Sequence, residues 1–293
     1  YVLLIRSERD RFVGAEMFEL DDLDVARARF EELRPNPLRI PPNAATRASD
    51  RVQEAGRAQD WDALRALCAP ELEYDDRRRG LRSAGDREMY LASMQHIFSG
   101  RARAARTVLA TSGDRLALEH ILWTGPENAS TFEIEALSLC EVDAEGRIVA
   151  RIFFDPDDRR GAGAELFERY VRSDAGRWMS PKGVEFRRAV RDHDVVRIRA
   201  VLPDDFLFHD HRRTGAGRLE GADSYVAWLA ALFEQSADAT IEPLYYVVWG
   251  AHGFVAVGHT FGTNAEGGEF ESVFVQLGLN EGAELVGAEL FEL

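Results

Sequence analysis

The sequence has little positive charge and almost no lysine. Lys182 is its single lysine, and 51 acidic residues against 36 lysine and arginine residues give a formal net charge of −15. Such an acidic surface repels phosphate backbones and anionic bilayers. Long apolar runs are also missing, since none reaches the roughly 18 residues that a membrane-spanning helix needs. The sequence therefore predicts neither a nucleic-acid partner nor a membrane partner.

Cysteine is scarce as well, and the motifs that hold metals or cofactors are absent. Cys68 and Cys140 lie far apart in apolar segments, and no CxxC or other zinc spacing occurs. The sequence contains no P-loop, dinucleotide fingerprint, nucleophile elbow or HExxH motif. We therefore expect no metal and no cofactor. Two buried free thiols are typical of a reducing compartment, so we expect a cytoplasmic protein.

What the sequence does contain is an internal repeat. The segment VGAEMFEL at 13–20 returns as VGAELFEL at 286–293, with Leu290 in place of Met17. A weaker copy, IVARIFFDP, lies between them at 148–156. The repeating unit is about 136 residues long, which is the size of one globular domain. This spacing predicts tandem copies of a domain and is too long for a solenoid repeat.

The repeat divides the chain into four parts. Residues 1–34 are expected to be the tail of a preceding repeat, with two strands and a helix over 22–33, because the chain opens inside a strand-like run. Four prolines mark a linker over 35–44. The first complete domain is expected at 45–170 and the second at 171–293.

Both expected domains have the same order of elements, which indicates an α+β fold. Helices come first, then one strand, one helix and a run of strands joined by short turns, a pattern typical of a curled antiparallel sheet packed on about three helices. In the first domain we expect helices within 45–67, a strand at 72–78, a helix at 86–98, strands at 105–111, 115–123, 132–142 and 147–154, and a closing helix at 157–170. In the second we expect a helix at 182–202, a strand at 206–215, a helix at 222–233 and strands at 240–249, 253–262, 269–279 and 284–291.

Three motifs carry a resemblance to a known superfamily. They are DDRRRGL at 75–81, DAEGRIVARIFFDPDD at 143–158 and DHRRTGAGRLEGADSYV at 210–226. They resemble tandem SnoaL-like domains of the nuclear transport factor 2-like superfamily, as appended to large bacterial regulatory proteins. The resemblance implies cone-shaped domains with an apolar pocket. It also implies a small apolar or aromatic ligand, and either a homo-oligomer (a homodimer) or packing on a neighbouring repeat.

Enzymes of this superfamily work by acid–base catalysis without a cofactor, so recurring carboxylates and imidazoles are candidate catalytic residues. When the repeats are aligned by sequence, Asp75 matches Asp210 and His120 matches His259. Burial would raise the pKa of such an aspartate toward neutrality. The alternatives are an aspartate that caps a turn or pairs with a neighbouring arginine, and a histidine that is part of the core.

Aromatic side chains are candidates for lining the two pockets. The candidate ligand-binding residues are Tyr90, Trp123 and Phe132 in the first domain and His211, Tyr225, Trp228 and Phe261 in the second. His209 and His211 share one face of a strand, but no third ligand lies at useful spacing, so no metal site is expected.

Two functions from different classes fit these observations. The first is a non-catalytic small-molecule-binding or scaffolding module of a larger bacterial regulatory protein. The alternative is a cofactor-independent cyclase, isomerase, dehydratase or epoxide hydrolase. We favour the first because several polar positions differ between the copies. We also expect residues 1–34 to dock on a sheet, either in the same chain or in a homodimer.

Overall fold

The computed structural model describes residues 1–293 except 9–10, 24, 27–28, 30–39 and 126–131. These residues form two compact units, Tyr1–Arg39 and Ile40–Leu293. In the first unit, β1 (Val2–Glu8) pairs antiparallel with β2 (Arg11–Phe18), and a 3-10 turn, η1 (Leu20–Asp22), follows. The two strands expected in the tail are confirmed. Most of the helix expected over 22–33 and half of the linker expected over 35–44 lie outside the described residues.

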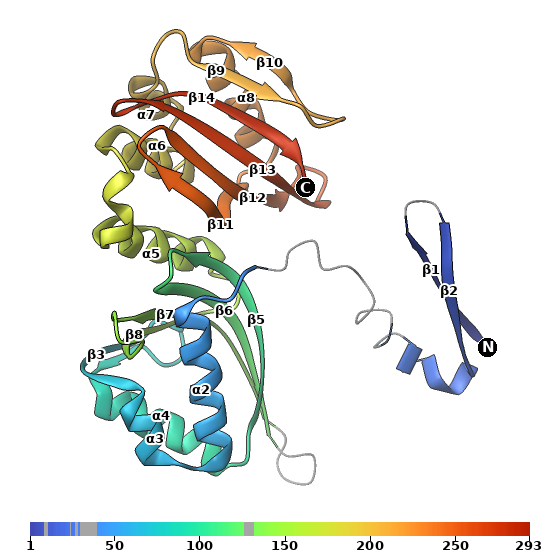
Figure 1. Ribbon diagram of the computed structural model, residues 1–293, viewed down its shortest axis with the longest axis vertical. Helices are drawn as coiled ribbons and strands as arrows, with labels where there is room; N and C mark the ends of the chain where they lie inside the picture. Colours follow the sequence, from blue (N-terminus) through green and yellow to red (C-terminus); the bar gives the residue numbers. More distant parts are fainter. Residues whose placement is uncertain (9–10, 24, 27–28, 30–39, 126–131) are drawn as a thin grey trace. The chain divides into compact units, whose positions relative to one another are not determined.

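The second unit contains two six-stranded sheets, each packed with helices (Figure 1). The elements of the first domain are α2 (Ala44–Ala58), α3 (Trp61–Ala66), β3 (Cys68–Asp76), β4 (Ser83–Gly85), α4 (Arg87–Ser99), β5 (Arg103–Ser112), β6 (Leu116–Thr124), β7 (Glu133–Val142), β8 (Ile148–Phe154) and α5 (Arg159–Arg172). Its strands lie in the order β4-β3-β8-β7-β6-β5.

After a 3-10 segment, η2 (Asp174–Trp178), the second domain repeats this plan. Its elements are α6 (Pro181–Arg191), α7 (Val195–Val201), β9 (Leu207–Asp210), β10 (Gly217–Glu220), α8 (Ala222–Gln235), β11 (Thr240–Gly250), β12 (Gly253–Thr263), β13 (Glu269–Glu281) and β14 (Glu284–Glu292). The strand order, β10-β9-β14-β13-β12-β11, is that of the first domain element for element. The α+β class and the pair of similar domains are confirmed.

Three local features differ from the sequence expectations. Each sheet is mixed, because β3 pairs parallel with β8 and β9 pairs parallel with β14. A helix and four strands separate the members of each parallel pair in the chain, and parallel pairing needs a long connection of this kind. The short edge strands β4 and β10 were not expected. The single helix expected over 182–202 is broken at His193, whose φ is 55°, and Asp194 then caps α7 by accepting from the Arg197 N–H.

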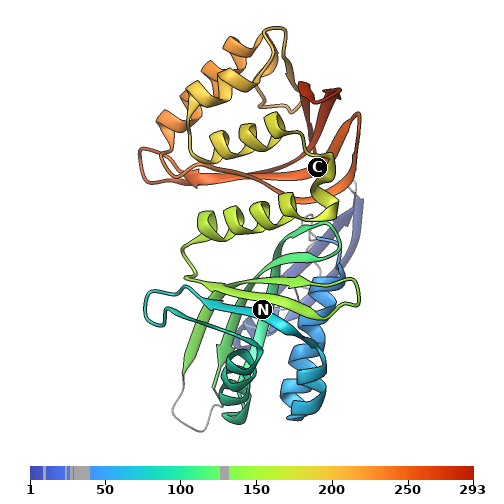
Figure 2. The same ribbon diagram turned by 90° about the vertical axis from the view of Figure 1, so that its left-hand side faces the viewer.

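The two faces of the first sheet are covered by different helices. Successive residues of β6 point to opposite faces of the sheet. Ala117 and Ile121 are buried against α2 and α4 on one face. Leu116 and Leu118 are buried against Leu166 of α5 on the other face. We call these the inner face and the outer face. Figure 2 shows α2 and α5 on opposite sides of this sheet.

In the second domain α6, α7 and α8 lie on the inner face of the sheet (Figure 1). Phe186 of α6, Ile198 of α7 and Leu229 of α8 share one buried core with Phe274 and Leu290 of the sheet. The helices therefore cover the concave side of the second sheet, where the resemblance implied a pocket.

Candidate functional site

The second domain holds a cavity of about 260 Å³ between α8 and the inner face of its sheet. This volume is near the lower end of the range of roughly 300–1,000 Å³ for small-molecule pockets. The lining residues are Phe208, Arg212, Thr214, Tyr225, Trp228, Leu232, Ile241, Thr260, Ser272, Phe274, Gln276 and Leu290. The cavity is thus mainly apolar, with a few polar groups that converge from the strands.

Aromatic rings from two elements form one wall of the cavity. The Phe208 ring on β9 lies 4.9 Å from Tyr225 and 5.1 Å from Trp228, both on α8. Tyr225 and Trp228 stand at helical spacing i and i+3, so both face the sheet. A planar or aromatic ligand would find flat surfaces here.

A glycine in β12 shapes the opposite wall. Gly258 pairs with Phe274 on β13, and a Cβ at Gly258 would lie only 2.5 Å from the Phe274 ring. The absence of a side chain lets this ring lie flat against β12. Thr260 follows on the same face and is small enough to leave the space above it open.

The polar end of the cavity is an ion pair between β9 and the turn that follows it. Arg212 donates from Nε to Asp210 Oδ1 at 2.8 Å and from Nη2 to Asp210 Oδ2 at 2.8 Å. The Ala216 N–H also donates to this carboxylate, and Arg212 Nη1 donates to Ser272 Oγ at 2.9 Å. Burial alone would raise the pKa of Asp210, but the hydrogen bonds from Arg212 and Ala216 hold it below its ordinary value.

The remaining polar groups in the lining are neutral. Thr214, Thr260 and Ser272 supply hydroxyls, and Gln276 supplies an amide. These groups can donate to and accept from a ligand, but none of them titrates near neutral pH. The arrangement can therefore orient a polar group of a ligand without transferring a proton to it.

The corresponding space in the first domain is filled by side chains. When Asp76 and Asp210 are taken as equivalent, the pairing of neighbouring strands shows which other residues correspond. Glu119 then corresponds to Ala256 of the second domain, and Arg151 corresponds to Ala288. The same registers place Trp123 at the position of Thr260. Two small residues and a threonine in the second domain are thus replaced by three large side chains in the first.

These large side chains form a buried polar cluster on the inner face of the first sheet. Glu119 lies 3.2 Å from Arg106 Nη1 and 3.6 Å from Arg151 Nη1, yet neither carboxylate oxygen has hydrogen-bond geometry with any described residue. Arg151 donates to Ser138 and Ser49. Burial raises the pKa of Glu119 above its ordinary value, and the two arginines oppose that rise. The side chains of this cluster fill the space inside the cone of the first domain.

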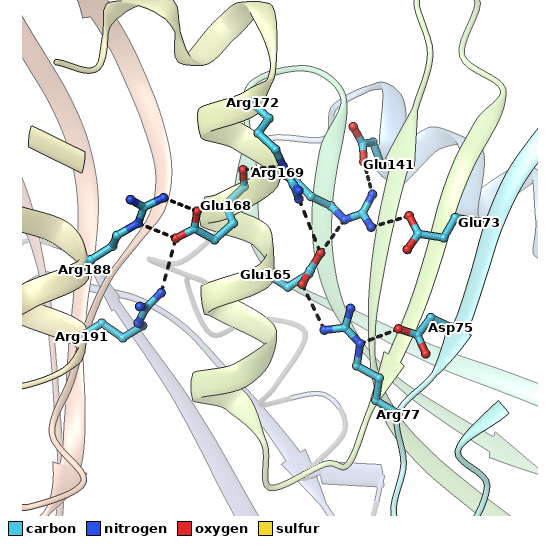
Figure 3. A network of polar contacts seen from close by, with 10 residues as sticks. All are labelled: Glu73, Asp75, Arg77, Glu141, Glu165, Glu168, Arg169, Arg172, Arg188 and Arg191. Carbon is cyan, nitrogen blue, oxygen red and sulfur yellow. Dashed lines mark hydrogen bonds and ion pairs between the residues drawn. The ribbon is translucent and has the colours of Figure 1, made fainter. Parts of the chain in front are cut away.

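Asp75 lies on the outer face, away from this cluster. Its carboxylate accepts from Arg77 Nε at 2.6 Å, and Arg77 also donates to Glu165 of α5 (Figure 3). Glu165 in turn accepts from Arg169, which reaches Glu73 and Glu141 on the sheet. Asp75 therefore belongs to the polar network that joins α5 to the sheet.

The structure also changes which residues of the two repeats correspond. Asp210 matches Asp76 and not Asp75, because Arg78 donates to Asp76 from N, Nε and Nη2 as Arg212 does to Asp210. The strand registers likewise place Leu122, and not His120, at the position of His259.

The candidate acid–base pairs are not brought together. β3 and β6 are separated by β8 and β7, and β9 and β12 by β14 and β13. Three strand spacings put the backbones about 14 Å apart. His120 instead contacts Glu135 at 2.6 Å. His259 is on the outer face beside Phe261, while Asp210 faces the inner side, so these two residues also lie on opposite faces.

Of the aromatic candidates, Tyr225 and Trp228 line the cavity. Tyr90 and Trp123 are buried in the core of the first domain, and Phe132 packs against that core. Phe261 lies on the outer face beside His259. His211 stacks on Phe291 and contacts Glu289, outside the cavity.

Most residues that line the cavity were not singled out from the sequence. Thr260, Ser272, Phe274 and Gln276 alternate along β12 and β13, so the period of two residues could have placed them on one face. What the sequence lacked was a signal for which of the two faces is concave.

Comparisons with known proteins found one family model and several similar solved structures. A family model described as the SnoaL-like domain matches residues 184–277. No curated protein matched the chain. Solved structures similar to it include an LEH-like epoxide hydrolase from Mycobacterium tuberculosis, with 17% identity over 44% of this chain and 95% of that one and a TM-score of 0.31.

Two further similar structures come from other bacteria. A nuclear transport factor 2-like protein of unknown function from Burkholderia pseudomallei is 20% identical over 38% of this chain and 88% of its own, with a TM-score of 0.33. A Catenulispora acidiphila protein with a ketosteroid isomerase-like fold, in complex with trimethylamine, is 12% identical over 39% and 85%, with a TM-score of 0.34. The match to the SnoaL-like domain model at residues 184–277 lies within the second domain, and the two similar sheets are consistent with tandem domains of this kind.

Proposed function

We propose that the protein is a binding module whose second domain takes up one small, mainly apolar molecule in the cavity beneath α8. The observation that carries this proposal is the contrast between the two cones. The second has a cavity of about 260 Å³ with aromatic walls, and the equivalent space in the first is occupied by Glu119, Arg151 and Trp123. A mainly apolar cavity with a few convergent polar groups is the usual form of a small-molecule site.

The acid–base alternative is less well supported by the same residues. A general base works best when its pKa lies near the operating pH. The hydrogen bonds from Arg212 hold the pKa of Asp210 below its ordinary value, and no histidine reaches that carboxylate among the described residues. Asp210 therefore serves to hold Arg212 and the following turn in place, and the ligand is bound without being converted.

Native mass spectrometry of the gently purified protein tests this proposal. We expect one co-purifying molecule per chain in the wild type. Thr260→Trp should lose this molecule, because it places in the cavity the same large side chain that Trp123 provides at the equivalent position of the first domain. Ser224→Trp is the matched control, because Ser224 is exposed on α8 and does not line the cavity. Retention of the molecule by Thr260→Trp would contradict the proposed site.

Chemical analysis of the released molecule separates binding from catalysis. When the molecule is returned to excess protein, we expect it to be recovered unchanged. Conversion by the wild type that is abolished in Asp210→Asn would establish an enzyme in place of a binding module.

A further inference from the structure

A second cleft lies where the two domains meet, between α5, α6 and β11. Its volume is about 60 Å³, and its apolar lining includes Leu166, Phe167, Tyr170, Ile241, Pro243 and Tyr246. The Tyr170 and Tyr246 rings stack with centroids 5.7 Å apart. Arg187, Pro243 and Tyr246 also line an adjoining void of about 50 Å³ beneath α6, so the two spaces share a wall.

Two of the charged side chains in the cleft are neutralised within the protein. Glu242 accepts from Arg159 Nε at 3.0 Å. Arg191 lies 3.7 Å from Glu168 of α5, and its Nε donates to Asp192 at 3.0 Å. Figure 3 shows Arg188 and Arg191 of α6 both directed at Glu168.

The other two charged side chains, Arg160 and Arg187, form no ion pair with any residue in the described ranges of the chain. Arg187 is half-buried and lies over the Phe167 ring, 5.9 Å from its centroid. A partly buried cation without a counter-ion is costly to desolvate. In a protein with a net charge of −15, two free arginines on one apolar cleft are positioned to receive an anion.

The adjoining void contains a second unsatisfied group. The indole N–H of Trp249 is buried and has no acceptor among the described residues. Trp249 lines this void together with Trp178, Met179 and Phe186. Buried donors are nearly always paired, so this N–H is available to an acceptor that enters the void.

We propose that the cleft between the domains binds a small carboxylate with a short apolar body. The carboxylate lies beside Arg187 and Arg160, and the apolar part lies against Tyr170 and Tyr246. Arg160 is exposed and is neutralised in part by solvent, so one negative charge beside the half-buried Arg187 is sufficient, and the planar guanidinium of arginine suits a carboxylate. Because α5 belongs to the first domain and α6 and β11 to the second, the bound molecule contacts both. This site is separate from the cavity beneath α8 and does not depend on it.

Calorimetric titration of the full chain with hexanoate, hexan-1-ol and hexyl phosphate tests this assignment. Hexanoate is expected to bind about tenfold more tightly than hexan-1-ol, corresponding to roughly one charge-assisted hydrogen bond. Equal affinity for the acid and the alcohol would overturn the anion site. Tighter binding of hexyl phosphate would overturn the carboxylate assignment.

Variants locate the binding. Arg187→Gln should weaken hexanoate about tenfold and leave hexan-1-ol unchanged. Arg187→Lys keeps the charge but loses the planar guanidinium, so its affinity for hexanoate should lie between those of the wild type and Arg187→Gln. Ala164→Phe should fill the cleft and abolish binding of hexanoate, and Arg218→Gln, on β10 outside the cleft, should have no effect. Circular dichroism and the melting temperature check that each variant is folded. Loss of hexanoate in Thr260→Trp but not in Ala164→Phe would place the binding in the other cavity and contradict the proposal.

Discussion

Arg212 donates three hydrogen bonds to the carboxylate of Asp210, one from its backbone N–H and two from its guanidinium. The side chain of Asp210 is fully buried, and that of Arg212 is 16% exposed. This pair closes the polar end of the cavity in the second domain, and Arg78 and Asp76 repeat it in the first. Under the proposed function, Asp210 holds Arg212 and the following turn in place.

Removal of the arginine is expected to be costly. Arg212→Gln leaves the buried Asp210 carboxylate without its cation, which should lower the free energy of unfolding by about 3 kcal/mol. Urea unfolding measures the change. Arg213→Gln is the control, because this neighbouring arginine is exposed and its loss should change stability by less than about 0.5 kcal/mol. If both substitutions lowered the free energy of unfolding equally, the buried ion pair would stabilise the fold no more than an exposed arginine does.

Asp210 also predicts a dependence of stability on pH. Because its folded pKa is below its ordinary value, the unfolded chain takes up the proton first as the pH falls. The stabilisation is present in full above about pH 5 and is lost progressively below the ordinary aspartate pKa of about 3.9. Urea unfolding between pH 7 and 3 should therefore show the wild type and Asp210→Asn converging at the acid end. A constant difference between them would contradict this assignment.

His259 predicts a loss of stability in the same direction as Asp210, with falling pH, but in a higher pH range. Burial lowers the pKa of His259, Arg159 lowers it further, and Glu242 and Glu271 oppose the change. As the pH falls, the unfolded chain therefore takes up a proton on His259 near the ordinary histidine pKa of about 6.5, before the folded protein does. The folded protein loses stability as the pH falls from 7.5 to 5.5.

Substitution of His259 by glutamine should reduce that loss. Thermal unfolding of His259→Gln and wild type across this pH range measures the difference. Phe261→Leu perturbs the ring beside His259 without removing the titrating group, so it should keep the pH dependence of the wild type. If His259→Gln follows the wild-type curve, His259 is not the group responsible.

For the buried cluster in the first domain, we expect the effects of two substitutions on the free energy of unfolding to be non-additive. Arg151→Met removes one cation from the buried Glu119 and should cost about 3 kcal/mol of unfolding free energy. Glu119→Leu combined with Arg151→Met replaces charges by apolar groups of similar size and should recover at least half of that loss.

Chemical denaturation of the two single variants and the double variant measures this coupling. The exposed pair Arg65 and Glu88 offers a comparison, because its removal should change stability by less than about 1 kcal/mol. Additive losses at Glu119 and Arg151 would argue against a coupled buried cluster.

The fold was largely predictable because the repeat, the strand alternation and the helix caps point to the same plan. The edge strands β4 and β10 were missed because each is short and follows an arginine- and glycine-rich turn. The break between α6 and α7 was missed because the apolar periodicity continues across His193, which adopts a left-handed conformation without being glycine.

The site was less predictable because small errors in alignment change the face of a strand. Two adjacent aspartates, Asp75 and Asp76, could each be matched to Asp210, and the wrong choice moves the side chain from the inner face to the outer face. Whether a cone is open also depends on residues from five strands and a helix at once. The exchange of Trp123 for Thr260 is readable only when the strand registers are known.

The proposed function requires that the cone of the second domain is open and that the cone of the first is filled. The most direct measurement is the stoichiometry of a neutral aromatic probe, N-phenyl-1-naphthylamine, by calorimetric titration of the wild type and Thr260→Trp. We expect one probe molecule per chain in the wild type and none in the variant. Two molecules per chain, or one that Thr260→Trp does not displace, would contradict it.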